Sequence, residues 1–164
     1  MGVQRILILC VGSRLMGDDA VGLIVGEILL EREMPAEVRI FESGSNVFAL
    51  LDEIMEFDEV VIIDSIKSGL APGEVAVIDL RNLIQGSMDE IQSLHDIDVV
   101  SAIKLGYELF GEKMPRRIFL IGVGVRDISP GIKLSAEVEK AIPKIMEEVS
   151  RFLKRDPSNF SQPS

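Results

Sequence analysis

The segment RILILCVGSRLMGDDAVG, residues 5–22, sets the architecture expected for the rest of the chain. It begins with the wholly apolar run 6–10, crosses a loop that contains two glycines, and reaches Asp18 and Asp19 just before an apolar pattern of helical spacing. A buried strand that passes at once into a helix is typical of the opening of a β-α-β unit. Ligands in such sheets bind beyond the carboxyl ends of the strands. Two carboxylates there would repel a phosphate, so the segment favours a site for a cation or for a proton in transit.

The composition is that of an ordinary globular protein. The chain has 164 residues, of which 47% are hydrophobic and 27% charged, enough for one domain with a core of its own. The net charge of −10 argues against a nucleic-acid partner. We expect no membrane partner, because no apolar run approaches the roughly 20 residues of a span, and no signal peptide is evident. The single cysteine, Cys10, fits a cytoplasmic protein, and its place in the first strand predicts a buried side chain rather than a nucleophile.

The hydrophobic pattern predicts alternating strands and helices. Strands are expected at 6–10, 37–43, 60–63, 74–79 and 116–123, and helices at 20–33, 46–55, 99–110 and 136–153. The connection into the 74–79 strand is too short for a helical crossover, so that strand is expected to be antiparallel to its neighbour. Residues 81–97 show no clear periodicity. The fold class is therefore a three-layer α/β/α sandwich around a mixed sheet of about five strands, with the three most apolar strands at its centre.

A single domain is expected over residues 1–153, followed by a flexible tail, 154–164. No internal repeat and no second domain is evident in the sequence.

Three titratable residues form a candidate site. Asp19 follows the first strand, Asp64 ends the apolar run 60–63, and His95, the only histidine, lies in the irregular segment. Parallel neighbouring strands would bring the two aspartates to one edge of the sheet. One imidazole and two carboxylates suit a borderline divalent metal such as nickel, zinc or iron. Each residue also has a simpler interpretation, since an Asp after a strand often caps a helix and a lone His is often solvated.

Other chemistries find less support. Ser65 lacks the flanking glycines of a nucleophile elbow. The run 122–124 lacks the third glycine and the following helix of a dinucleotide fingerprint. A hydrolase or phosphorylase that acts on small anions would need a basic cluster, whereas Lys67, Arg116 and Arg117 are scattered along the chain. A flavodoxin-like nucleotide site is disfavoured by acids where the phosphate would bind.

The run Val11-Gly12-Ser13-Arg14-Leu15-Met16-Gly17-Asp18-Asp19-Ala20-Val21-Gly22 resembles the opening motif of the [NiFe]-hydrogenase maturation endopeptidases. Three further parts of the chain match that family in order and approximate spacing. They are Asp64 after Val-Ile-Ile, the segment 93–95, and the stretch from Gly122 to Ser135. The resemblance covers about residues 5–150. One departure is Ser13, where the family usually has Asn.

The resemblance implies a phosphorylase/hydrolase-like sheet and an endopeptidase. Such proteins remove a C-terminal extension from the precursor of a hydrogenase large subunit once nickel has been inserted. Asp19, Asp64 and His95 would then be both the metal-contacting and the catalytic set, and Gly44 would help to shape the cleft. The nickel would be carried by the substrate, so the resting protein could be free of metal. Either the metal or a carboxylate would activate water. A non-catalytic nickel checkpoint or chaperone for the same precursor is the alternative.

Overall fold

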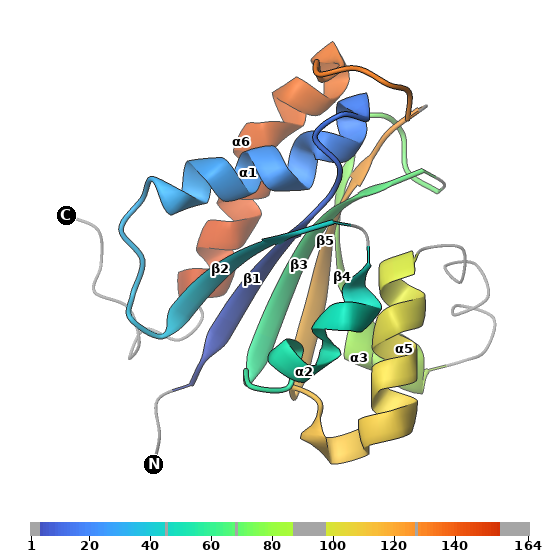
Figure 1. Cartoon of the computed structure of the whole chain (residues 1–164). Coiled ribbons are helices and arrows are strands. Elements are labelled where there is room, and N and C mark those ends of the chain that lie inside the picture. Colours follow the sequence, from blue (N-terminus) through green and yellow to red (C-terminus); the bar gives the residue numbers. More distant parts are fainter. Residues whose placement is uncertain (1–3, 45, 68, 87–97, 127, 155–164) are drawn as a thin grey trace.

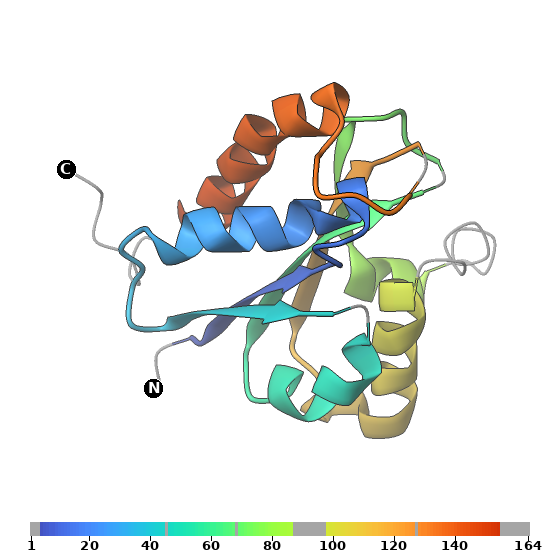
Figure 2. The ribbon, with the colours of Figure 1, turned by 45° about the horizontal axis from the view of Figure 1, so that its top comes forward.

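The computed structural model describes residues 4–44, 46–67, 69–86, 98–126 and 128–154. A five-stranded sheet runs through the centre in the order β2-β1-β3-β5-β4, and helices cover both of its faces (Figures 1 and 2). This arrangement confirms the predicted three-layer α/β/α sandwich. It also confirms the prediction that the three most apolar strands are central and the other two lie at the edges.

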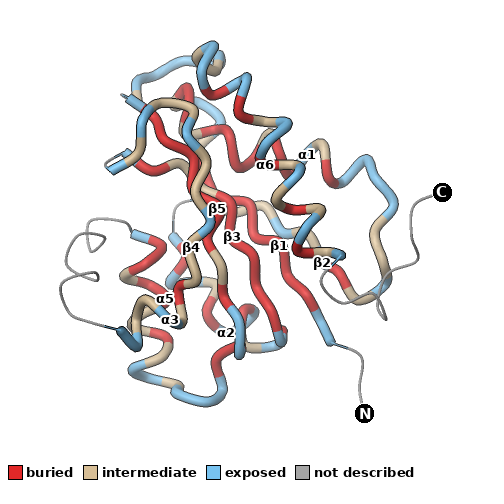
Figure 3. Tube along the Cα trace, turned by 180° about the vertical axis from the view of Figure 1, so that it is seen from behind, coloured by how far each residue is buried: buried red, intermediate tan, exposed pale blue. Residues whose placement is uncertain are grey.

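Four of the strands are parallel. They are β1 (Ile6–Val11), β2 (Val38–Ser43), β3 (Glu59–Ile66) and β5 (Arg117–Gly124). The fifth, β4 (Val75–Asp79), pairs with β5 in the antiparallel direction, as its short connection requires. Because β1 and β3 are neighbours, with Cys10 opposite Ile63, their carboxyl ends lie side by side. Figure 3 shows that these central strands are buried along nearly their whole length.

The helices divide between the two faces of the sheet. One face carries α1 (Val21–Leu30) and α6 (Ala136–Lys154), and the other carries α2 (Leu51–Ile54), α3 (Leu80–Gln85) and α5 (Asp98–Phe110) (Figure 1). Single turns of 3-10 helix precede α1 (η1, Gly17–Ala20) and α2 (η2, Val47–Leu50) and follow α5 (η3, Gly111–Lys113). In the described part of the chain, no helix has the length and apolarity needed to cross a membrane.

Two expectations about the helices need correction. Residues 80–85, which overlap the stretch 81–97 without clear periodicity, form α3. This helix begins where the Asp79 side chain accepts a hydrogen bond from the Asn82 N–H at 3.1 Å. The single helix expected over 46–55 is instead a 3-10 turn that continues into four residues of α-helix. Both elements are short, so their local capping and packing matter more than the periodicity of the sequence.

Close contact between α1 and the sheet explains the glycines of the opening segment. A Cβ built on Gly22 would lie 2.3 Å from the Val11 carbonyl oxygen and 2.7 Å from that of Ile63. A Cβ on Gly26 would lie 3.1 Å from the Cys10 side chain. These glycines therefore allow the first turns of α1 to rest directly on the carboxyl ends of β1 and β3, next to the candidate site.

Candidate active site

Asp19 is held at the carboxyl edge of the sheet by the backbone of its own loop. The loop turns at Gly17, which has a positive φ of 56°. The Asp19 carbonyl then accepts a hydrogen bond from the Ser13 N–H at 3.3 Å. A Cβ built on Gly12 would lie 2.1 Å from the same carbonyl oxygen, so only glycine fits there. Because the bond uses the backbone of residue 13, the departure from the family at Ser13 leaves this support intact.

Asp64 lies on the neighbouring strand at the same edge. Strand β3 continues through Ile66, so Asp64 sits two residues before its end rather than after it. The next residue, Ser65, donates a hydrogen bond from its Oγ to Asp19 Oδ1 at 2.7 Å and from its N–H to Asp64 Oδ1 at 2.8 Å. One serine thus joins the two carboxylates. The structure brings Asp19 and Asp64 together, as the parallel strands predict.

Asp64 holds its proton unusually tightly. The pKa of its carboxyl is raised from 3.8 to about 8, mainly by burial and in addition by the negative charges of Asp19 and Asp98, against a lowering by the Ser65 N–H. At neutral pH this side chain is therefore mostly protonated. A neutral carboxyl beside a second carboxylate is a typical arrangement for acid–base chemistry, and strongly perturbed groups of this kind mark candidate functional sites.

The adjacent acid, Asp18, has a structural role. Its Oδ1 accepts a hydrogen bond from the Ser135 N–H at 2.6 Å, just before α6 begins. In the same region the Gly131 N–H donates to the Leu15 carbonyl at 2.9 Å, and the Gly17 N–H donates to the Gly131 carbonyl at 2.8 Å. These bonds form a clasp between the opening loop and residues 131–135. The clasp connects two of the parts of the sequence that resemble the maturation endopeptidases, the opening run 11–22 and the stretch 122–135.

A charged triad supports the outer side of the opening loop. The Arg14 guanidinium donates hydrogen bonds to the carboxylates of Glu27, on α1, and Glu42, on β2, the second at 2.8 Å. All three side chains are at least partly exposed, so the triad connects the loop to α1 and β2 but adds little to stability.

His95 lies outside the described residues. Within the described segments no three His, Cys, Asp or Glu side chains are grouped closely enough to hold a metal ion. Cys10 is fully buried, and burial together with the charge of Glu42 raises the pKa of its thiol to about 12, so it is not a nucleophile. A Cβ on Gly44 would meet nothing within 4 Å, so packing in the described part of the chain does not require glycine there.

The sequence interpretation missed three contributors to this site. Ser65 links the two carboxylates, Asp98 contributes its charge, and Ser135 supplies an amide to Asp18. The proximity of Asp98 to Asp64 carries no signal in the sequence, because it depends on how α5 packs against the sheet.

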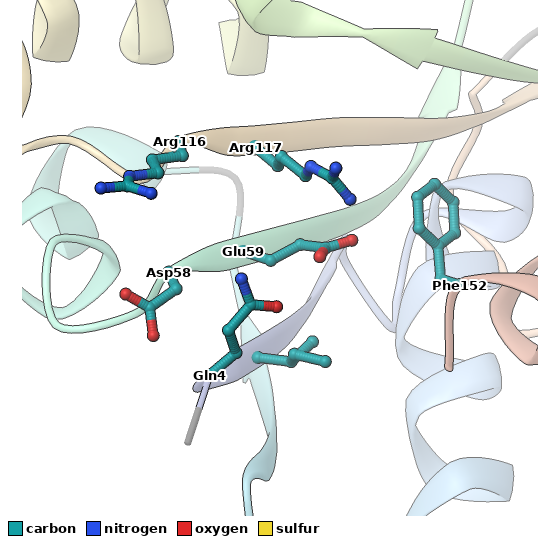
Figure 4. A pocket seen from close by; sticks show the side chains of 7 residues that line it. Gln4, Asp58, Glu59, Arg116, Arg117 and Phe152 are labelled. Atoms are coloured by element: carbon teal, nitrogen blue, oxygen red, sulfur yellow. The ribbon is translucent and has the colours of Figure 1, made fainter. Parts of the chain in front are cut away.

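The pocket in Figure 4 is separate from this site. It has a volume of about 320 Å³ and lies at the amino ends of β1, β3 and β5, on the opposite edge of the sheet. Its lining includes Gln4, Asp58, Glu59, Arg116, Arg117 and Phe152.

Comparison with known proteins points to one family. The family model for hydrogenase maturation proteases matches residues 24–152 of the chain. The hydrogenase 2 maturation protease of Escherichia coli K12 is 31% identical over 153 residues, which cover 92% of each protein.

Solved structures agree with this result. The hydrogenase maturating endopeptidase HybD from E. coli superposes with a TM-score of 0.75 at 28% identity, and 92% of each chain is covered. The [NiFe] hydrogenase maturation protease HybD from Thermococcus kodakarensis superposes with a TM-score of 0.69 at 29% identity, over 91% of this chain and 99% of that one.

Proposed function

Because the chain belongs to the hydrogenase maturation protease family, and is a peptide hydrolase acting on hydrogenase precursors, we propose a more specific activity for it. It removes the C-terminal extension of a [NiFe]-hydrogenase large-subunit precursor after nickel has been inserted. Asp19, Asp64 and His95 read the nickel that the substrate carries. The enzyme works in the cytoplasm, and nickel is part of its substrate rather than a resident cofactor.

The observation that carries this proposal is the pair of carboxylates joined by Ser65. Asp19 Oδ1 is fixed at 2.7 Å from the Ser65 hydroxyl, and Asp64 lies close enough for the charge of Asp19 to raise its pKa. Carboxylate oxygens together with an imidazole nitrogen fit a borderline divalent cation such as nickel. Two protein carboxylates alone would bind such an ion weakly, which fits an ion that arrives already bound to the substrate.

His95 completes the proposed set through its place in the sequence. It lies three residues before Asp98, the first residue of α5, whose charge also raises the pKa of Asp64. Three residues of fully extended chain span about 10 Å. The proposal requires the imidazole to lie within this reach of Asp98 and to meet the two carboxylates.

The proton on Asp64 suggests why nickel would act as a signal for cleavage. With a pKa of about 8, the Asp64 carboxyl is mostly neutral at pH 7 and is then a poor general base. A nearby cation favours the ionised form of a carboxyl, so the proton would leave Asp64 when nickel-loaded precursor docks. The ionised carboxylate could then contact the metal or take a proton from the attacking water. Nickel bound to the precursor would supply Lewis acidity at the scissile carbonyl.

Processing of a purified precursor tests the proposal. Nickel-loaded and nickel-free large-subunit precursors are incubated with the enzyme, and the mass of the subunit is followed by mass spectrometry. We expect cleavage only of the loaded form, and a loss of about a hundredfold or more in rate for Asp19→Asn, Asp64→Asn and His95→Ala. Asp52→Asn, at an exposed position on α2, is the matched control.

Three results would count against the assignment. Unchanged cleavage by all three variants would remove these residues from the site. Equal cleavage of nickel-free precursor would remove nickel from the recognition step. A stable complex with no change in mass would favour the non-catalytic checkpoint.

A further inference from the structure

The outer edge of β2 is open for pairing. In the described part of the chain β2 pairs only with β1. The carbonyls of Glu37 and Ser43 accept hydrogen bonds from β1-side amides, those of Ile6 and Gly12. Since the direction of backbone groups alternates along a strand, the odd-numbered residues face β1 and the N–H and C=O groups of Ile40 and Glu42 face outward. Figure 1 shows β2 at the margin of the sheet.

An apolar groove lies beside this open edge. It has a volume of about 360 Å³ and runs between the β1–β2 surface and the short η2–α2 segment. Its lining includes the apolar side chains Leu9, Phe41, Leu50 and Phe57 and the charged residues Arg39 and Glu53. Phe41 remains 44% exposed, although it lies opposite the buried Leu9 on the neighbouring strand. Because α2 has only four residues, it covers Leu9 but leaves Phe41 exposed.

The edge of β2 leads directly to the candidate active site. Ser43, its last residue, lies opposite Val11, and the Ser43 carbonyl accepts the Gly12 N–H at 3.1 Å. Gly12 in turn packs against the backbone of Asp19. A polypeptide laid along β2 therefore ends at the same edge of the sheet as Asp19 and Asp64, two strand spacings (roughly 10 Å) from β1 and three (roughly 14 Å) from β3.

We propose that β2 and the groove bind an extended segment of the precursor polypeptide as an added strand. Its backbone pairs with Ile40 and Glu42, and an apolar side chain on the groove side packs against Phe41. Main-chain pairing gives affinity in this mode of recognition, and the pockets for alternate side chains give selectivity. The inference rests on the proposed function, since the occupant is the substrate of that site. Continuity between the strand edge and the carboxylates favours substrate over a second copy of the chain.

Steady-state cleavage of nickel-loaded precursor tests the inference, with two pairs of variants. Ile40→Pro removes an outward N–H without touching the ladder to β1. Its control is Val77→Pro on β4, the other edge strand. The Glu74 carbonyl accepts the Gly124 N–H and so faces β5. Because the direction alternates along the strand, the N–H of Val77 faces outward, as that of Ile40 does. Phe41→Ala removes the exposed ring, and Val77→Ala, at a side chain 39% exposed, is its control.

We expect KM to rise about tenfold in Ile40→Pro and in Phe41→Ala, with kcat changed by less than about twofold. Both Val77 variants should keep the KM of the wild type. Amide exchange on the Asp64→Asn variant, mixed with the precursor, should show the N–H groups of Ile40 and Glu42 becoming protected.

Two outcomes would overturn this inference and leave the proposed function intact. The first is cleavage by the wild type with an unchanged KM in both β2 variants. The second is a dimer in solution that Ile40→Pro dissociates without any change in KM. Phe41→Ala decides the matter by itself if Ile40→Pro does not fold. Absence of cleavage by the wild type would instead overturn the proposed function, and the docking inference with it.

Discussion

Replacing Asp64 by Asn should stabilise the protein, and the effect should grow with pH. The folded chain holds this carboxyl at a pKa of about 8, against 3.8 as the ordinary value, chiefly because the group is buried. A raised pKa means that the folded state binds a proton that the unfolded state releases. The stability associated with neutral Asp64 is therefore fully present below pH 4 and is lost as the pH rises toward 8.

The size of the effect follows from the same shift. Between the two pKa values the cost grows by about 1.4 kcal/mol per pH unit, so at pH 7 it reaches at most about 4 kcal/mol. Asn is neutral at every pH and keeps an oxygen that can accept the Ser65 N–H. The variant should therefore escape this cost.

Urea unfolding of the wild type and Asp64→Asn at pH 5 and pH 7.5 measures the difference. We expect the advantage of the variant to increase by about 2–3 kcal/mol across that range. Asp52→Asn, at an exposed position, should follow the wild type at both pH values. An advantage that is the same at pH 5 and pH 7.5 would refute the raised pKa. A variant less stable than the wild type at pH 7.5 would refute it as well.

Three further predictions concern the surroundings of the site. Asp18→Ala should lower the free energy of unfolding by about 1–3 kcal/mol, because the partly buried Ser135 N–H loses its acceptor. Urea denaturation measures this change, and an unchanged midpoint would contradict the prediction. Gly22→Ala should lower the free energy of unfolding by about 1–3 kcal/mol or more, because the new methyl group would collide with two strand carbonyls. Gly44→Ala, the control, should change the melting temperature little. Equal melting temperatures for the two variants would show that α1 can shift away from the sheet. Cys10 should resist alkylation by iodoacetamide in the native protein at pH 8 and react in urea, because its thiol is buried and has a pKa of about 12. Mass spectrometry measures the labelling, and rapid labelling of the native protein would disprove the burial.

The sequence predicts the sheet well because its main strands are long apolar runs. Four strands in a β-α-β order constrain the topology, and a tight connection constrains the direction of β4. Helix α3 is harder to predict, because six residues carry little periodic signal and the Asp79 cap looks like any acid at the end of a strand. The pattern Leu80, Leu83 and Ile84 is visible only once the boundaries of the helix are known.

For the site, the sequence predicts which side chains meet but not their protonation. Asp19 and Asp64 meet because parallel neighbouring strands bring their carboxyl ends to one edge. The proton on Asp64 depends on burial and on the charge of Asp98, and both arise from tertiary packing. The role of Asp18 depends on an amide 117 residues away. The contribution of His95 stays a prediction.

The clasp between the opening loop and residues 131–135 links the site to the order of synthesis. A ribosome delivers Asp19 and Asp64 long before Ser135, whereas a domain generally folds as a unit. A nascent chain that ends before Ser135 has no amide to offer Asp18 and no carbonyl of Gly131 to receive the Gly17 N–H. The loop that carries Asp18 and Asp19 thus gains its last support only when translation of the domain is almost finished.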